Sequence, residues 1–244
     1  LPFTAEGFSR AASMLTASRR YTSLVPTQLE RLAAEVDTDD LLRAQLKRFD
    51  AILVGGQAAN PLTVERLRAL GINLVETYGM TETCGGCVYD GVALDGVTVE
   101  LVGESRIKIG GSTLANEFVA DGGFITNDLG EFDAQHRLRV LGRIDRVIAS
   151  GGVKIALDRV EQLAAQVPGV VDVAASPIQD AEWGQRVGIA YQGSPEVADN
   201  IAEALADTLG PAGKPVRVIR IDKLPRLTSG KPDLLAIKTI FEEN

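Results

Sequence analysis

Residues 78–83, Tyr-Gly-Met-Thr-Glu-Thr, combine hydroxyl groups with a carboxylate directly after an apolar strand expected at residues 72–75. In open α/β sheets, ligands bind beyond the carboxyl ends of the strands, so this segment lies where a site is expected. The hydroxyl of Thr81 and nearby backbone N–H groups could donate to a phosphate. Glu82 offers the oxygen ligand that Mg²⁺ prefers. The alternative interpretation is a helix start, with a threonine cap and Glu82 in the first turn.

Three further stretches carry residue types suited to nucleotide chemistry. Residues 55–58 (Gly-Gly-Gln-Ala) follow another apolar strand, and residues 126–130 (Thr-Asn-Asp-Leu-Gly) and 142–145 (Gly-Arg-Ile-Asp) supply carboxylates and an arginine. Residues 225–232 contain Ser-Gly-Lys, but the P-loop spacing G-x-x-x-x-G-K-[ST] is absent. Each stretch also has an ordinary interpretation: a glycine turn, a Thr-x-Asp turn or a surface lysine.

The elements that must position these stretches change in character along the chain. Up to Gly91, apolar strands alternate with helix-like segments, which indicates an α/β fold with a parallel, doubly wound sheet. The almost wholly apolar strand at 51–54 is expected to be buried on both faces. After Gly91, short strands and glycine turns predict a small β-barrel or antiparallel layer. From about Val147, the pattern indicates a compact α+β domain of about 95 residues.

The expected boundaries follow from hydrophobic periodicity and from glycine and proline positions. Helices are expected at 8–17, with Thr4 as a candidate cap, and at 27–36, 41–48, from 61 onward, 157–166, 195–209 and 232–241. Strands are expected at 21–25, 51–54, 72–75, 97–102, 106–109, 124–126, 138–141, 170–176, 187–191 and 216–221.

The composition excludes several classes of protein. Acidic residues outnumber basic ones by 33 to 25, and the net charge of -8 argues against nucleic-acid and anionic-membrane binding. No apolar run approaches the roughly 20 residues of a membrane helix, and no secretory signal is visible. The two cysteines, Cys84 and Cys87, suit neither a disulfide framework nor a zinc site, so a reduced cytoplasmic protein is expected.

The motifs resemble those of the adenylate-forming superfamily, which includes acyl-CoA synthetases, luciferases and peptide-synthetase adenylation domains. Residues 78–82 match the Tyr-Gly-x-Thr-Glu motif in full, and residues 225–231 resemble the C-terminal Pro-x-x-x-x-Gly-Lys motif. The motifs occur in the family's order and spacing over nearly the whole chain. The resemblance implies an AMP-forming acid–CoA ligase that uses ATP, Mg²⁺ and coenzyme A: acyl-AMP forms first, and the thioester follows.

The resemblance also implies roles for individual residues. Lys231, Thr81 and Glu82 would be catalytic, with Lys231 stabilising charge as pyrophosphate leaves and Glu82 binding the metal. Asp128 would accept from both ribose hydroxyls, with Arg143 supporting it. The implied nucleotide-binding residues are Gly55, Gly56, Gln57, Tyr78, Gly79, Met80, Thr81, Asp128 and Arg143. The family's Thr-Gly-Asp has Asn127 in place of glycine here, and the turn is expected to survive because asparagine tolerates positive φ.

The same resemblance implies a division into domains. Residues 1–142 would be the C-terminal portion of the large nucleotide- and acyl-binding domain, residues 143–146 a hinge centred on Asp145, and residues 147–244 a mobile α+β domain. Gly151 and Gly152 would line the coenzyme A tunnel after the domain swings, although a plain β-turn explains the same residues.

Residues 78–95 and 20–29 are similar to the o-succinylbenzoate–CoA ligases of menaquinone biosynthesis. That similarity implies o-succinylbenzoate as the acid, and Arg20 is one candidate partner for its second carboxylate. The implied acyl-binding residues are Tyr21, Ser23, Gly79, Gly85 and Gly86.

The chain begins Leu-Pro-Phe without an initiator methionine and contains no Ser/Thr/Gly-rich loop ending in lysine for the ATP phosphates, so a truncated ligase with little activity of its own is expected. Two alternatives stay open: an adenylation domain that loads a carrier protein, and a non-catalytic nucleotide-binding module. Small molecules are the expected partners, and a homodimer is left open. His136 is interpreted as a turn residue and Trp183 as a packing residue.

Overall fold

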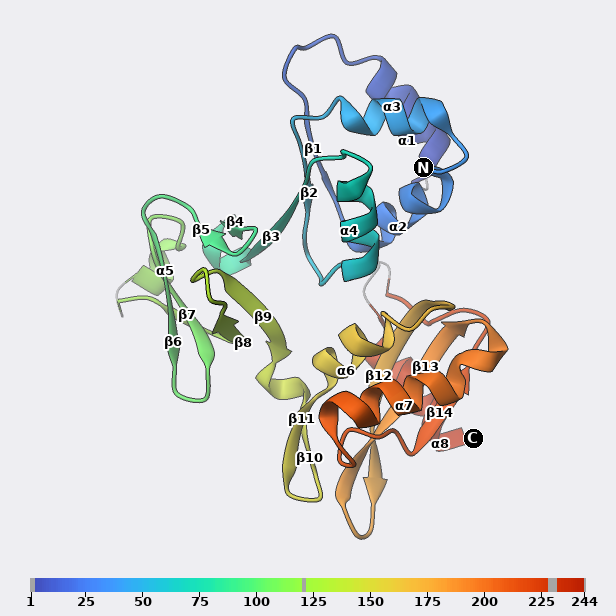
Figure 1. Cartoon of the computed structure of the whole chain (residues 1–244). Coiled ribbons are helices and arrows are strands. Elements are labelled where there is room, and N and C mark those ends of the chain that lie inside the picture. Colours follow the sequence, from blue (N-terminus) through green and yellow to red (C-terminus); the bar gives the residue numbers. More distant parts are fainter. Residues whose placement is uncertain (1–2, 120–121, 228–231, 244) are drawn as a thin grey trace. The chain divides into compact units, whose positions relative to one another are not determined.

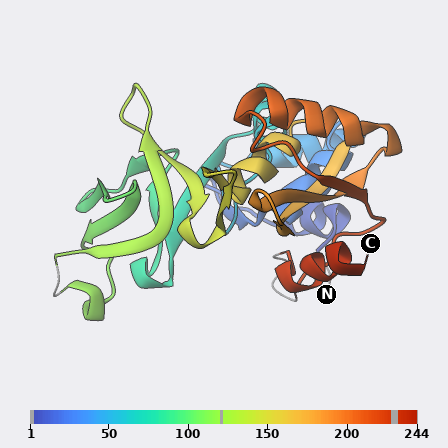
Figure 2. The ribbon, with the colours of Figure 1, turned by 90° about the horizontal axis from the view of Figure 1, so that it is seen from below.

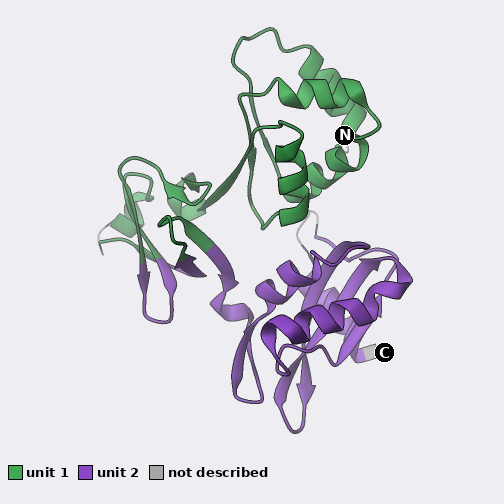
Figure 3. Ribbon diagram, viewed as in Figure 1, with its two compact units in different colours: residues 1–100, 108–125, 132–139 green, residues 101–107, 126–131, 140–244 purple. Residues whose placement is uncertain are grey.

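The computed structural model describes residues 3–119, 122–227 and 232–243, which form two compact units (Figures 1 and 3). Unit 1 comprises residues 1–100, 108–125 and 132–139, and unit 2 comprises residues 101–107, 126–131 and 140–244. Chain segments on either side of the expected hinge at 143–146 therefore belong to unit 2. Among the described residues, no helix is both long enough and apolar enough to cross a membrane.

Unit 1 is built on a five-stranded sheet in the order β1-β2-β3-β4-β5. Strands β1, β2 and β3 are parallel, as expected, whereas β4 and β5 continue the sheet in antiparallel pairing. The strands are β1 (Tyr21–Leu24), β2 (Ala51–Val54), β3 (Leu74–Met80), β4 (Gly85–Tyr89) and β5 (Val92–Ala93). The helices beside it are α1 (Ala5–Ser13), α2 (Pro26–Glu35), α3 (Asp40–Lys47) and α4 (Pro61–Ala69). Thr4 caps α1 by accepting from Gly7 N–H at 3.0 Å, which confirms its expected role.

The buried apolar residues of the parallel strands lie on one face of the sheet. Leu24, Ile52, Val54 and Leu74 pack with apolar residues of α1–α4 into one core cluster. The alternate residues are only half-buried or exposed, so the expectation that strand 51–54 is buried on both faces is wrong for the described residues. The physical reason is that α1–α4 all pack on one face, while the other face borders a cavity.

A second sheet has the order β6-β7-β8-β9 and carries part of the candidate site. Its strands are β6 (Val97–Val102), β7 (Arg106–Gly111), β8 (Phe124–Phe132) and β9 (Leu138–Arg143), with α5 (Asn116–Val119) between β7 and β8. Strand β8 is much longer than the expected strand 124–126. It therefore carries the Thr-Asn-Asp segment inside the strand.

Unit 2 contains a third sheet in the order β11-β10-β13-β12, with β14 beside β13. Its elements are β10 (Val147–Ser150), β11 (Val153–Ala156), α6 (Leu157–Ala164), β12 (Val170–Asp180), β13 (Gly184–Gly193), α7 (Ala198–Leu209), β14 (Arg217–Arg220) and α8 (Leu234–Glu243). Along β13, Ile189 and Tyr191 pack with α6 and α7, whereas Ala190 packs with α8. Helices α6 and α7 thus cover one face and α8 the other (Figure 2).

Candidate functional site

A cavity of about 440 Å³ in unit 1 lies where β1, β2 and β3 end. Its lining includes glycines of two stretches that the sequence analysis singled out, residues 55–58 and 78–95. Its lining residues are Ser23, Leu24, Val25, Gln28, Leu53, Gly55, Gly56, Thr77, Gly79, Met80, Gly85, Gly86 and Tyr89. The structure thus brings predicted nucleotide-binding and acyl-binding residues around one space. Tyr21, Gln57, Tyr78, Thr81 and Glu82 are not among the lining residues, and the Tyr21 side chain is exposed.

Gln28, Thr77 and Tyr89 line the cavity but were not predicted. Sequence analysis ended the strand at residue 75, whereas β3 runs to Met80 because β4 pairs with it, with Tyr78 opposite Val88. The motif residues 78–80 therefore lie in the strand and not after it. Alternation along the longer strand would have placed Thr77 on the same face as Val75.

A 3₁₀ turn at Thr81–Thr83 follows β3 and carries the predicted catalytic residues. Thr83 is 1% exposed; its hydroxyl accepts from Met80 N–H at 2.9 Å and is 2.7 Å from Gly85 O, to which it can donate. Ala115 N–H donates to Glu82 O at 2.9 Å. These bonds fix the backbone of the turn, while Thr81 stays exposed and Glu82 half-buried. The alternative interpretation placed a threonine cap at a helix start; the structure instead has a single 3₁₀ turn with Met80 at its N-cap, and Glu82 does lie in its first turn.

The donor set around Glu82 fits a magnesium ion only if a substrate completes the coordination shell. Among the described residues, no three His, Cys, Asp or Glu side chains cluster to hold a metal. Mg²⁺ commonly binds through one or two carboxylates together with substrate phosphates, so a single carboxylate suffices for that mode.

Cys84 is exposed and Cys87 is buried, and both are free. Burial raises the pKa of the Cys87 thiol.

Gly79 allows β3 and β4 to approach closely beside the cavity. A Cβ at this position would lie 1.9 Å from Gly85 O, which is backbone and cannot turn away. Gly79→Ala is therefore expected to destabilise the chain by about 3 kcal/mol, measured by urea unfolding. Gly103→Ala is the control, because a Cβ there meets nothing within 4 Å and only its φ of +55° costs energy, about 1 kcal/mol. Equal losses for the two variants would contradict this account.

Arg20 does not belong to the cavity. Its side chain is 7% exposed, and its guanidinium donates to Ala17 O at 3.2 Å and to Leu15 O at 2.7 Å. These hydrogen bonds join Nε and Nη2 of Arg20 to the segment that precedes β1, and the role of Arg20 toward a substrate carboxylate stays a prediction.

Asp128, Arg143 and Asp145 form an ion cluster in unit 2. Arg143 donates to both oxygens of Asp145, at 3.0 and 2.7 Å, and its Nη1 lies 3.6 Å from Asp128 Oδ1. The hydrogen bond with Asp145 raises the pKa of Arg143, and the hydrogen bond from Arg143 lowers the pKa of Asp145. The Asp128 side chain is 16% exposed. The backbone N–H of Asp128 donates to the Thr126 hydroxyl at 3.0 Å. The structure thus holds the Asp128 carboxylate beside a guanidinium.

Asn127 behaves differently from the expectation. It lies inside β8 and is not among the described residues with positive φ, so the expected positive-φ turn is wrong. Extended backbone is open to any residue, and asparagine in place of glycine therefore costs no strain here. Asn127 Oδ1 also accepts from Arg106 Nη2 at 3.1 Å.

Gly151 and Gly152 connect β10 to β11 in a two-residue turn, with φ of +55° and +83°. Two positive φ values are typical of the tight hairpin turn that glycine favours. Trp183 packs beneath it, since a Cβ on Gly151 would lie 2.6 Å from the indole. This confirms Trp183 as a packing residue. His136, at φ of +59°, is confirmed as a turn residue and stacks on Phe132 at 4.3 Å.

Lys231 lies outside the described residues, but both flanks of its segment are defined. Arg226 pairs with Pro232 in an isolated β-bridge, and Asp233 N–H donates to Pro225 O at 2.9 Å. The Arg226 guanidinium also forms an ion pair with Asp172 of β12. The two ends of the segment are therefore held close together.

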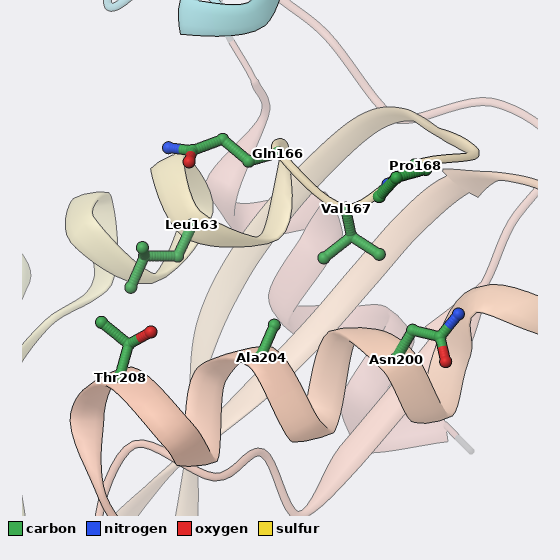
Figure 4. A pocket seen from close by; sticks show the side chains of 7 residues that line it. All are labelled: Leu163, Gln166, Val167, Pro168, Asn200, Ala204 and Thr208. Atoms are coloured by element: carbon green, nitrogen blue, oxygen red, sulfur yellow. The ribbon is translucent and has the colours of Figure 1, made fainter.

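A cavity of about 430 Å³ in unit 2 lies between α6 and α7 (Figure 4). It is lined by Leu163, Gln166, Val167, Pro168, Asn200, Ala204 and Thr208. Apolar side chains, amides and a hydroxyl make up this lining, and none of them titrates near neutral pH. This cavity is therefore a weaker candidate for catalysis than the cavity in unit 1.

Two family models match the chain. Residues 11–117 match the model described as AMP-binding enzyme, and residues 159–231 match the AMP-binding enzyme C-terminal domain. A protein of Mycobacterium tuberculosis (strain CDC 1551 / Oshkosh), described as a probable 2-succinylbenzoate–CoA ligase, is 38% identical over 246 residues. That match covers 95% of this chain and 63% of the relative, so the chain spans less than two thirds of the relative's length.

Solved structures share the fold. The amide bond synthetase McbA from Marinactinospora thermotolerans matches with a TM-score of 0.85 at 22% identity, over 98% of this chain and 55% of that one. The o-succinylbenzoate CoA synthetase of Bacillus subtilis, in complex with its acyl-adenylate intermediate, matches with a TM-score of 0.81 at 22% identity. The match covers 97% of this chain and 54% of that one. These matches confirm the expected α/β fold class.

Proposed function

Because the chain belongs to the AMP-binding enzyme family, we propose that its protein is an AMP-forming acid–CoA ligase. The observation that carries this proposal is the 38% identity to a probable 2-succinylbenzoate–CoA ligase over 95% of the chain. In the first step, a carboxylate oxygen of the acid attacks the α-phosphorus of ATP, and the bond to pyrophosphate breaks. In the second, the coenzyme A sulfur attacks the acyl carbon, its proton is lost, and AMP leaves.

Candidate nucleotide contacts are proposed within each unit separately. Gly56 is proposed to leave backbone open to a flat base, because a Cβ there would meet only Val25, at 3.8 Å. Gly55 is proposed as a neighbouring backbone contact; a Cβ there would lie 2.2 Å from the Thr77 hydroxyl. Asp128 is proposed to accept hydrogen bonds from the ribose hydroxyls, and the Arg143 guanidinium lies 3.6 Å from this carboxylate. Gln57, Tyr78, Met80 and Thr81 are proposed as further nucleotide contacts. Glu82 is proposed to hold Mg²⁺, which when bound offsets phosphate charge.

Lys231 is proposed to stabilise the charge that develops on the α-phosphate during the first step. The Asp145 region is proposed as the hinge between a large domain at 1–142 and a mobile domain at 147–244. Rotation there would bring Gly151 and Gly152 to the coenzyme A arm for the second step, a hinge motion of the kind that gates many enzymes.

We propose 2-succinylbenzoate, the same compound as o-succinylbenzoate, as the acid. Support comes from the named relative and from the cavity wall, where Ser23 adds a hydroxyl and a Cβ on Gly85 would meet nothing within 4 Å. Gly79 and Gly86 are proposed as further parts of the acyl-binding wall. A Cβ on Gly86 would lie 2.8 Å from the Tyr89 hydroxyl, so this wall tolerates little added volume. Tyr21 shares its strand face with Ser23 and is proposed to border the acyl group.

The test uses the protein as its gene encodes it, supplied with ATP, Mg²⁺ and coenzyme A. Benzoate, 2-succinylbenzoate and a medium-chain fatty acid are compared by pyrophosphate release and by mass spectrometry of the thioester. We expect kcat/KM for 2-succinylbenzoate to exceed that for benzoate by at least about 100-fold, because benzoate lacks the succinyl chain and its carboxylate. Equal values would overturn the choice of acid. Transfer to a carrier protein but not to coenzyme A would favour the adenylation-domain alternative.

The 244 residues tested alone are expected to bind ATP weakly and to turn over little, because they contain no Ser/Thr/Gly-rich loop with a lysine for the phosphates. A cytoplasmic location and a homodimer remain predictions.

A further inference from the structure

Asp158, at the start of α6, binds the residues on both sides of Asp145. Its Oδ2 accepts from the backbone N–H of Arg143 at 2.7 Å, and its Oδ1 accepts from the Arg146 guanidinium. One carboxylate therefore bridges the segment that enters the proposed hinge and the segment that leaves it. The Asp158 side chain is 19% exposed.

Gly142 makes this approach possible. Its φ is +139°, and a Cβ there would lie 2.5 Å from Asp158 Cβ and 2.6 Å from Asp158 Oδ2. Any side chain at residue 142 would therefore occupy the space of the carboxylate. The requirement for glycine at this position follows from Asp158 as well as from the backbone conformation.

Arg146 is anchored to unit 2 independently of Asp158. Its guanidinium donates to both oxygens of Glu161, at 3.0 and 2.7 Å, and to Ala175 O of β12 at 3.1 Å. Glu161 Oε1 also accepts from Ala175 N–H at 2.7 Å. Burial alone would lower the pKa of Arg146, but its bonds with Glu161 and Asp158 outweigh this and raise the pKa, so the guanidinium stays charged. Arg146, Glu161 and Asp158 therefore form one fixed group with α6 and β12.

Arg143 does not belong to this fixed group, because it precedes Asp145 in the chain. A rotation about the backbone of Asp145 moves the fixed group relative to Arg143. The hydrogen bond from Arg143 N–H to Asp158 then has to break, while the bonds of Arg146 to Asp158 and Glu161 can persist. The Asp158–Arg143 bond thus belongs to one hinge conformation only.

We propose that Asp158 is a positioning residue that holds the hinge at Asp145 in one of its two conformations by accepting the Arg143 backbone N–H. This proposal rests on the proposed function, because it presumes that the hinge moves between two half-reactions. A hydrogen bond to a charged group shifts an equilibrium by roughly 10- to 100-fold. Losing it therefore disfavours the half-reaction that uses the held conformation and spares the other.

The test compares Asp158→Ala and Gly142→Ala in the protein as its gene encodes it. Acid-dependent pyrophosphate release and discharge of preformed acyl-AMP to coenzyme A are measured separately. We expect the ratio of the two rates to change at least tenfold, in the same direction for both variants. Asp199→Ala is the matched control, because Asp199 occupies the first turn of α7 as Asp158 occupies that of α6. Both rates falling equally, or a ratio unchanged within twofold, would overturn the proposal.

A second measurement does not depend on activity. Trypsin cleaves after arginine, and Arg143 and Arg146 flank the hinge. Without Asp158, cleavage after Arg143 or Arg146 is expected to be at least about fivefold faster than in the parent protein and in Asp199→Ala, because local opening becomes easier. Unchanged cleavage overturns the proposal. If the parent protein catalyses neither half-reaction, the proposed function fails, and the cleavage result still decides whether Asp158 restrains the hinge.

Discussion

Lys231→Ala is expected to slow acyl-adenylate formation by about 10²- to 10³-fold while discharge of preformed acyl-AMP to coenzyme A stays within about threefold of the parent rate. A preorganised charge aimed at the transition state contributes on this scale, and the ammonium group of Lys231 is proposed to act only in the first step. The measurement is single-turnover pyrophosphate release compared with thioester formation from synthetic acyl-AMP.

Lys223→Ala is the matched control, since Lys223 is an exposed lysine eight positions earlier, before the bridged segment. It should leave both half-reactions unchanged. If Lys231→Ala slows both half-reactions equally, Lys231 has a general structural role and not the one proposed. If it slows neither, the assignment from the Gly-Lys motif is wrong.

Asp128→Ala is expected to raise KM for ATP about 10- to 100-fold with kcat changed much less. The carboxylate is proposed to accept from two ribose hydroxyls, which bind equally in the ground and transition states, and lost uniform binding appears in KM. Asp128→Asn keeps an acceptor oxygen and should raise KM less. Steady-state kinetics with varied ATP at saturating acid measures both effects.

Asp95→Ala serves as the control, because Asp95 is an exposed acid in the turn before β6. Its KM for ATP should match that of the parent protein. An unchanged KM in Asp128→Ala would remove Asp128 from the nucleotide site. A lower unfolding midpoint together with a lower kcat would instead indicate that its pairing with Arg143, 3.6 Å away, mainly supports the fold.

The sequence predicted most elements because their apolar periodicity is strong. The parallel strands β1 to β3, the helices α2, α3 and α6, and the change in character after Gly91 all follow the expected pattern. Boundaries were predicted less well where pairing with a distant strand decides them. Strand β3 continues through Tyr78 to Met80 because β4 pairs with it. Local sequence propensity does not predict that pairing.

In the candidate site, too, residues marked by a local motif were predicted, and residues placed there by distant parts of the chain were not. Gly55, Gly79 and Gly86 were found because short motifs mark them, whereas Gln28 and Tyr89 line the same cavity without a motif. Asp158 reads in the sequence as an ordinary acid in the first turn of a helix. Its bonds to Arg143 and Arg146 become visible only when α6 is placed beside the hinge segment. Asn127 was misjudged because its turn was inferred from a motif and not from the strand that contains it.

The most direct test of the central claim is the identity of the nucleotide product and of the intermediate. The protein as its gene encodes it is incubated with 2-succinylbenzoate, ATP and Mg²⁺, and the mixture is resolved by mass spectrometry before and after coenzyme A is added. The account predicts acyl-AMP and pyrophosphate before the addition, and AMP and the acyl-CoA thioester in equal amounts after it. Formation of ADP and phosphate, or of no nucleotide product with any carboxylic acid, would contradict it.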